Sequence, residues 1–186
     1  NATYSYTATE ESYAGLATEG IYMMLLQTAS NIPVEQFENS GNEGHWNAYY
    51  MNPYWVRDNR RRERDVNRFN LLADVGYTFN DHISASIKTN GIFTFVDNLQ
   101  YENEYTEPTY ITDLTGSDRS APSTFRFYTT HYQRYYTDAM VNFDYMLSDD
   151  ISFQALIGGN NQYEKNTVSS VGGTGLTIPG LYTASN

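Results

Sequence analysis

Apolar and polar residues alternate with a period of two along much of the chain after residue 67, which is the pattern of β-strands. The alternation is clearest in four windows of residues, 69–79, 83–93, 135–145 and 153–163. In each window one set of alternate positions is mainly apolar or aromatic and the other is mainly polar. Successive side chains of a strand point to opposite faces, so each window predicts a strand with one apolar and one polar face.

The full extent of this pattern predicts an all-β, antiparallel fold of about five strands, with a short alternating stretch at the start of the chain. The predicted strands cover residues 1–10, 67–79, 83–105, 131–147 and 151–171. Two short polar segments, Asn80–His82 and Leu147–Asp150, predict tight hairpin turns. Long loops are expected over 11–66, 106–130 and 172–186, with a short helix from Gly20 to Leu26 in the first.

The charged and aromatic residues of the four windows fall on opposite faces. All charged residues are on the polar face, namely Asp74, Lys88, Asp138 and Asp144. Aromatic residues mark the ends of the apolar face, namely Phe69, Phe79, Phe93, Tyr135, Tyr145, Phe153 and Tyr163. In three windows the two aromatic ends are ten residues apart, and ten residues of a tilted strand rise about 25 Å. That is the height of the apolar band of an outer-membrane barrel.

Two hypotheses explain this pattern. In a transmembrane β-barrel the aromatic residues form the lipid-facing girdles and the charged residues face the lumen. In a soluble antiparallel sheet the apolar face is buried in a core. The alternation of short and long connections favours the barrel, whose turns are short on one side of the membrane and long on the other. About five strands are too few to close a membrane barrel, so we expect this chain to be a section of a larger one.

Composition and net charge further narrow the classes of protein to which this chain can belong. The chain has 186 residues, 18% of them charged, below the roughly 25% of a typical soluble domain, and aromatic residues reach 16%. A net charge of −11 argues against a nucleic-acid partner, which favours a basic surface. The lack of cysteine excludes disulfides, thiolate metal sites and thiol nucleophiles. No apolar run approaches the length of about 20 residues that a membrane helix needs, and no secretory signal is visible from Asn1.

Candidate catalytic and metal-binding residues are few. The three histidines are far apart, and motifs of metalloproteases, serine hydrolases and P-loop enzymes are missing from the sequence. We therefore expect no enzymatic activity, no metal site and no cofactor. His82 is interpreted as a solvated turn residue. Three acidic residues, Glu102, Glu104 and Glu107, form an acidic rim, with calcium binding as the alternative interpretation.

Two segments of the first long loop stand out. Residues 57–68 hold six of the eleven basic residues, interleaved with acids, and are interpreted as a loop that enters a strand with locally paired charges. Contact with lipopolysaccharide phosphates is the alternative. The segment before it supplies the candidate substrate-binding residues Trp46, Tyr49, Tyr50 and Trp55. Aromatic faces stack on sugar rings, although residues of this kind more often pack within their own loop.

Several segments appear in an order that resembles one family of transporters. These are residues 24–34 (MLLQTASNIPV), 51–56 (MNPYWV), Arg68-Phe69 at a strand entry, 158–160 (GGN) and 178–182 (IPGLY). They resemble the SusC/RagA family of TonB-linked outer-membrane transporters of Bacteroidetes. The family often has Pro-Arg where this chain has Ala29-Ser30.

The resemblance implies a 22-stranded barrel in the outer membrane of a Gram-negative bacterium, plugged by an N-terminal domain. It implies a SusD-like surface lipoprotein as partner, energy from TonB, and an oligosaccharide or peptide as cargo. No plug or TonB-contacting segment is recognisable in this sequence, so the chain is expected to supply part of the barrel wall and its extracellular loops. A soluble glycan-binding module and a passive porin are the alternatives.

Overall fold

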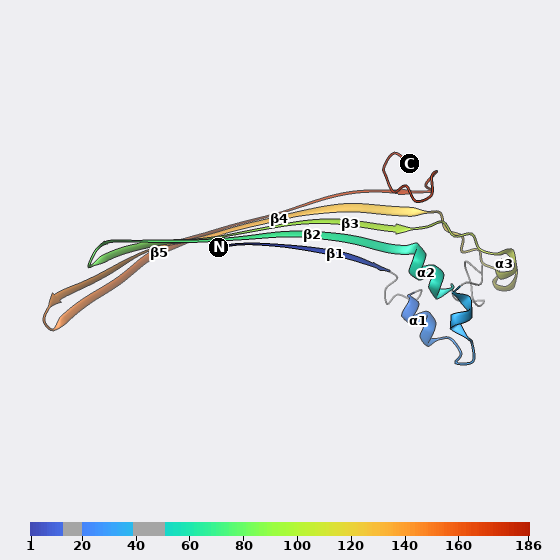
Figure 1. Ribbon diagram of the computed structural model, residues 1–186, viewed down its shortest axis with the longest axis horizontal. Helices are drawn as coiled ribbons and strands as arrows, with labels where there is room; N and C mark the ends of the chain where they lie inside the picture. The colour runs from blue at the N-terminus through green and yellow to red at the C-terminus, as the bar shows by residue number, and fades with distance from the viewer. Residues whose placement is uncertain (13–19, 39–50) are drawn as a thin grey trace. The chain divides into compact units, whose positions relative to one another are not determined.

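A computed structural model describes residues 1–12, 20–38 and 51–186. Its five strands are β1 (Ala2–Ser12), β2 (Arg60–Asn80), β3 (Ile83–Glu102), β4 (Thr124–Ser148) and β5 (Ile151–Thr174). They form a single antiparallel sheet in the order β1-β2-β3-β4-β5, so every strand pairs with its neighbour in the sequence (Figure 1). The predicted all-β, antiparallel fold of five strands is confirmed.

Both hairpin turns lie where the polar segments predict them. Residues 81 and 82 separate β2 from β3, and the Asn80 side-chain oxygen accepts a hydrogen bond from the His82 backbone at 2.9 Å. Asp149 and Asp150 separate β4 from β5. Short polar side chains that bond to a nearby backbone amide are what allow such tight reversals.

Four strands extend into residues that the alternation predicts as loops, and one strand ends earlier than predicted. Residues 11–12, 60–66, 124–130 and 172–174, expected in loops, belong to β1, β2, β4 and β5, whereas residues 103–105, expected in a strand, lie beyond the end of β3. In β2 the extension covers the Arg-rich run, which lacks apolar alternation. Arg60 pairs there with Glu102 of β3 at 2.7 Å, and Arg62 pairs with Glu11 of β1 at 3.2 Å. Opposite charges on neighbouring strands support pairing that a hydrophobicity pattern does not register.

The helical segments are α1 (Ile21–Leu26), η1 (Val34–Phe37), α2 (Pro53–Asn59) and α3 (Thr109–Thr115). α1 agrees with the helix expected from Gly20 to Leu26. α2 begins with an Asn52 cap, whose side-chain oxygen accepts from the Tyr54 backbone at 3.0 Å, and with Pro53 in its first turn. Among the described residues, no helix has the length and apolar character needed to cross a membrane.

The chain divides into two compact units. The first comprises residues 1–7, 66–96 and 129–169, and the second comprises residues 8–65, 97–128 and 170–186. Within the second unit Met24, Met51, Val56 and Tyr105 form a buried hydrophobic cluster. Every buried hydrophobic side chain among the described residues belongs to this second unit. The first unit is therefore a sheet without a buried apolar core of its own.

Candidate functional site

Aromatic rings on β1, β2 and β3 contact one another in the first unit. Tyr4 and Phe69 have ring centroids 4.7 Å apart, and Phe69 meets Phe95 edge-to-face at 6.4 Å. The Tyr4 hydroxyl donates a hydrogen bond to the Asn67 side chain at 2.7 Å. Contacts between rings on neighbouring strands require that the rings share one face of the sheet.

The same face continues onto β4 and β5. Phe93 lies two residues from Phe95 and so on the same side of β3. Its ring meets Tyr135 edge-to-face at 5.3 Å, and Tyr135 meets Tyr163 at 6.1 Å. A Cβ atom on Gly91 would lie 3.3 Å from the Phe93 ring, so the glycine lets the ring lie close to the backbone. We call Tyr4, Phe69, Phe93, Phe95, Tyr135 and Tyr163 the aromatic row.

The aromatic row contains four of the seven residues predicted as girdle residues. The sequence reasoning did not single out Tyr4 and Phe95, although both continue the alternation of their strands. The other three predicted residues lie near the hairpin turns. Phe79 meets Tyr77 edge-to-face at 4.9 Å, Tyr145 stacks on His82 at 4.6 Å, and Phe153 is half exposed. The predicted lipid contact of all seven stays a prediction.

The apolar residues between these two groups of aromatics are uncovered. Val75 on β2 is 66% exposed and Ile157 on β5 is 65% exposed. Both share the parity of the aromatic residues on their strands, and thus the same face. We call this surface, bounded by the aromatic row and the turn-side aromatics, the apolar face.

The opposite face of the first unit carries polar contacts between side chains. Lys88 lies 3.4 Å from Asp74 across the β2–β3 pair, and Gln154 donates to Asp144 at 3.4 Å across the β4–β5 pair. The Tyr136 hydroxyl donates to Asp138 at 2.8 Å. The four charged residues predicted on the polar face therefore all have polar partners there. Their position in a lumen stays a prediction.

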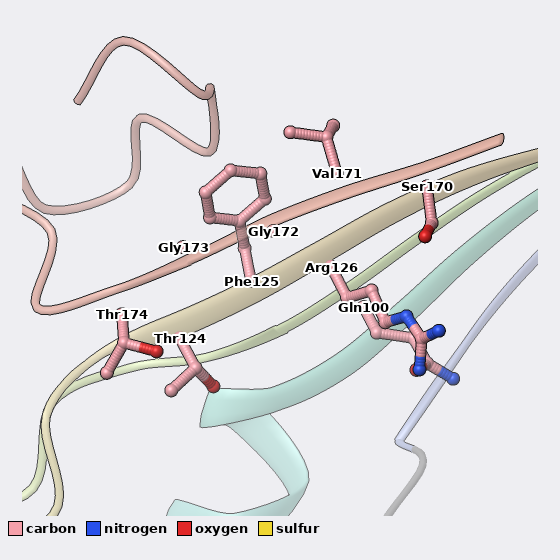
Figure 2. Close-up of a pocket in the computed structure, with 9 residues that line it drawn as sticks. All are labelled: Gln100, Thr124, Phe125, Arg126, Ser170, Val171, Gly172, Gly173 and Thr174. Atoms are coloured by element: carbon pink, nitrogen blue, oxygen red, sulfur yellow. The ribbon is translucent and has the colours of Figure 1, made fainter.

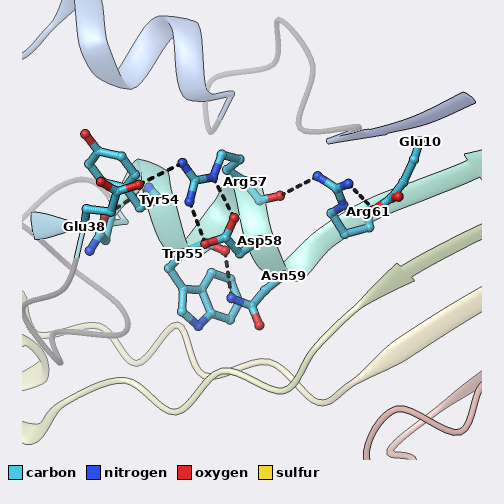
Figure 3. Close-up of polar contacts among 9 residues, drawn as sticks. Glu10, Glu38, Tyr54, Trp55, Arg57, Asp58, Asn59 and Arg61 are labelled. Atoms are coloured by element: carbon cyan, nitrogen blue, oxygen red, sulfur yellow. Dashed lines mark hydrogen bonds and ion pairs between the residues drawn. The ribbon is translucent and has the colours of Figure 1, made fainter. Parts of the chain in front are cut away.

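The Arg-rich segment of the second unit is compensated by acidic residues. Arg57 donates two hydrogen bonds to Asp58, at 2.6 and 2.9 Å, and a third to Glu38 at 3.3 Å (Figure 3). The hydrogen bonds from Arg57 lower the pKa of Asp58, and those to Asp58 raise the pKa of Arg57. Arg61, the second residue of β2, pairs with Glu10 of β1 (Figure 3). The expected local pairing holds for Arg57, whereas Arg60, Arg61 and Arg62 of β2 pair with acids on neighbouring strands.

The candidate substrate-binding aromatics have different outcomes. Trp46, Tyr49 and Tyr50 lie outside the described residues. Trp55 belongs to α2 and packs partly buried against the hydrophobic cluster, with its ring 5.2 Å from Tyr105. Its backbone oxygen accepts from the Asn59 side chain at 2.8 Å (Figure 3). These contacts support the packing alternative for Trp55.

Glu102 and Glu107 of the acidic rim make separate contacts. Glu102 pairs with Arg60, while Glu107 is buried and accepts a hydrogen bond from the Arg119 backbone. Burial, and secondly the charge of Glu107, raise the pKa of the Tyr105 hydroxyl to about 12. In the part of the chain that the structure describes, no group of three histidine or acidic side chains is placed to hold a metal ion.

A polar pocket of about 410 Å³ in the second unit is lined by residues of β3, β4 and β5. The side chains of Gln100, Thr124, Arg126, Ser170 and Thr174 line it together with residues 125 and 171–173. Arg126 and Gln100 extend to the same side of the sheet, whereas Phe125 and Val171 extend to the other (Figure 2). None of these lining residues was singled out from the sequence, because isolated polar residues on a strand are indistinguishable from an ordinary solvated face.

Two surfaces are thus candidates for function, the apolar face of the first unit and the polar pocket of the second. The first offers a large uncovered area for lipid or protein, and the second offers hydrogen-bonding groups for a small polar ligand. Comparison with protein-family models and with curated proteins gives no significant match to this chain.

Proposed function

We propose that the chain forms part of the wall of an outer-membrane barrel that actively imports a large nutrient, an oligosaccharide or a peptide. The observation that carries the proposal is the apolar face. Val75 and Ile157 on this face are strongly exposed, while every buried hydrophobic side chain among the described residues lies in the other unit. Contiguous apolar surface costs free energy in water at roughly 25 cal/mol per Å², and large uncovered patches mark contact with a membrane or a partner.

The placement of the aromatics supports lipid as the covering medium. Phe69 in the aromatic row and Phe79 beside the turn are ten residues apart on β2, which corresponds to a rise of about 25 Å for a tilted strand. Aromatic girdles at the two interfaces bound an apolar band of this height in outer-membrane barrels. A polar opposite face with the pairs Lys88–Asp74 and Gln154–Asp144 suits a water-filled interior.

The strand order supports a larger assembly. β1 and β5 each have one neighbour in the sheet, and the hydrocarbon region does not tolerate unpaired strand edges. In our proposal the remaining strands of the barrel pair with these two edges, and a plug fills the barrel. A SusD-like lipoprotein contacts the extracellular loops, and TonB supplies energy. These partners come from the family that the sequence resembles.

Membrane fractionation tests the lipid-facing role. We expect the protein, expressed in a Gram-negative host, to stay in the outer-membrane fraction after a high-salt wash and to need detergent for extraction. A protein that is released without detergent would favour a water-soluble glycan-binding module and end the transporter proposal.

Uptake measurements separate active import from passive diffusion. Cells that carry the protein should lose uptake of its cargo when the proton-motive force is dissipated or when TonB is deleted. Uptake that persists under both treatments would indicate a porin.

A further inference from the structure

We propose that the polar pocket binds a sugar acid, with the carboxylate of the sugar on Arg126 and its hydroxyl groups on the surrounding side chains. The pocket was defined above by five polar side chains in the second unit and holds about 410 Å³. This volume falls within the roughly 300–1,000 Å³ of small-molecule sites.

Arg126 brings an uncompensated positive charge to the pocket. Its guanidinium lies 6.0 Å from the centre of the Tyr128 ring, and it forms neither an ion pair nor a hydrogen bond with another described residue. By contrast, Arg61 and Arg62 pair with Glu10 and Glu11. An exposed guanidinium offers a planar pair of donors that matches the two oxygens of a carboxylate.

Gln100 adds a further donor. When its amide is oriented with the oxygen toward Arg62, that oxygen accepts hydrogen bonds from the arginine Nε and Nη2 at 2.8 and 2.6 Å. This orientation leaves the amide NH2 group to donate to a ligand. Arg126 and Gln100 extend to the same side of the sheet, so both donors face the same pocket (Figure 2).

The remaining lining groups are small and hydroxylated. Thr124, Ser170 and Thr174 each supply a hydroxyl that donates or accepts, as the hydroxyls of a sugar also do. Gly172 allows the close approach of β5 to β4, because a Cβ there would lie 2.7 Å from the Phe125 backbone oxygen. Hydroxyl and amide groups around one cationic group match a polyhydroxylated acid, because its carboxylate and its hydroxyls both find partners there.

The inference rests on the proposed function only for the route by which the ligand arrives, since binding itself needs no membrane. The test is calorimetric titration of the detergent-solubilised barrel that contains this chain with galacturonate, galactose, acetate and triglutamate. We expect galacturonate to bind at least tenfold more tightly than the other three, because only it engages both Arg126 and the hydroxyl groups.

Two variants locate the site. Arg126→Gln should reduce galacturonate affinity about tenfold or more, to the level of galactose. Arg64→Gln removes an exposed charge from the same unit outside the pocket, and should leave affinity unchanged. Thr174→Val should weaken galacturonate and galactose alike and leave acetate unaffected. Circular dichroism spectra that match the parent protein show that each variant is folded.

Four results would overturn the inference. The first three are a galacturonate affinity that survives Arg126→Gln, an acetate affinity equal to that of galacturonate, and an equal loss of affinity in Arg64→Gln. Tighter binding of triglutamate than of galacturonate would assign the pocket to acidic peptides instead. None of these results bears on membrane extraction or on uptake, so a failure of this inference is distinguishable from a failure of the proposed function.

Discussion

Replacement of Val75 by arginine tests which medium covers the apolar face. The Val75 side chain is 66% exposed, so little packing within the chain is lost when it is changed. On a water-facing surface such a substitution typically changes the free energy of unfolding by no more than about 0.5 kcal/mol. In lipid the same charge costs roughly 2–4 kcal/mol at the midplane of the bilayer.

The depth of Val75 follows from its place on β2. Val75 lies six residues from Phe69 and four residues from Phe79. At about 3.3 Å per residue and a tilt of roughly 40°, these spacings put it about 15 Å from one aromatic boundary and about 10 Å from the other along the membrane normal. This puts it within about 3 Å of the middle of the proposed band. Nearly the full midplane cost of roughly 2–4 kcal/mol is therefore expected.

The assay is reversible urea unfolding, from phospholipid vesicles, of the assembled barrel that contains this chain, followed by tryptophan fluorescence. Asn142→Arg is the matched control, because Asn142 is exposed on the polar face of β4 at a similar depth. We expect Val75→Arg to lower the free energy of unfolding by roughly 2–4 kcal/mol and the control by much less. Equal costs for the two variants would refute the assignment of faces, and a cost below about 0.5 kcal/mol for Val75→Arg would refute contact with lipid.

Three further predictions concern the second unit and the strand pairing. Gly172→Ala places a Cβ 2.7 Å from the Phe125 backbone oxygen and should destabilise β5 locally by about 1–3 kcal/mol. In the control Gly159→Ala the new Cβ meets no atom within 4 Å, so the change should be nearly neutral. Hydrogen exchange of the backbone amides beside each site compares the two variants. Asn52→Ala removes the cap of α2 and should cost about 0.5–2 kcal/mol by exchange of the helix amides, and an unchanged rate would contradict the capping role. Burial raises the pKa of Tyr105 to about 12 from an ordinary value of about 10, so the folded state holds this proton more tightly than the unfolded state. The resulting stabilisation is complete below pH 10 and should decrease as the pH rises from 10 to 12. Tyr105→Phe should make this decrease less steep in alkaline unfolding, and an unchanged slope would argue against burial of the hydroxyl.

The strands and their faces could be predicted from the sequence because a period of two is a local property. The spacing of Phe69, Asp74 and Phe79 within a single strand predicts which face of the sheet each side chain occupies, and the polar turn at Asn80–His82 marks where the chain reverses. The missed strand extensions have the opposite cause. Arg60 pairs with Glu102, and that pairing depends on an acid many residues away. A local pattern of hydrophobicity does not contain this information.

In the candidate sites, too, the features of single strands were visible in the sequence and the contacts between strands were not. The aromatic ends of the windows were visible in the sequence, but Tyr4 became part of the aromatic row only through its contact with Phe69 on a neighbouring strand. In the sequence Trp55 was a candidate both for stacking on a sugar and for packing within its loop, and its ring packs against Tyr105. The polar pocket carried no signal at all, because Gln100 and Arg126 come from different strands and meet only in the folded sheet.

The sequence by itself determined the element type, the sheet class and the separation of an apolar from a polar face, since these follow from the alternation of side chains along each strand. Only the tertiary structure decided which side chains meet across strands. It linked the rings into one row, paired Arg60 and Arg62 of β2 with acids on β3 and β1, and placed Arg126 and Gln100 around the same pocket. The physical reason is that hydrogen-bonded strands bring residues distant in the sequence within about 5 Å of each other, in a register that the whole sheet selects.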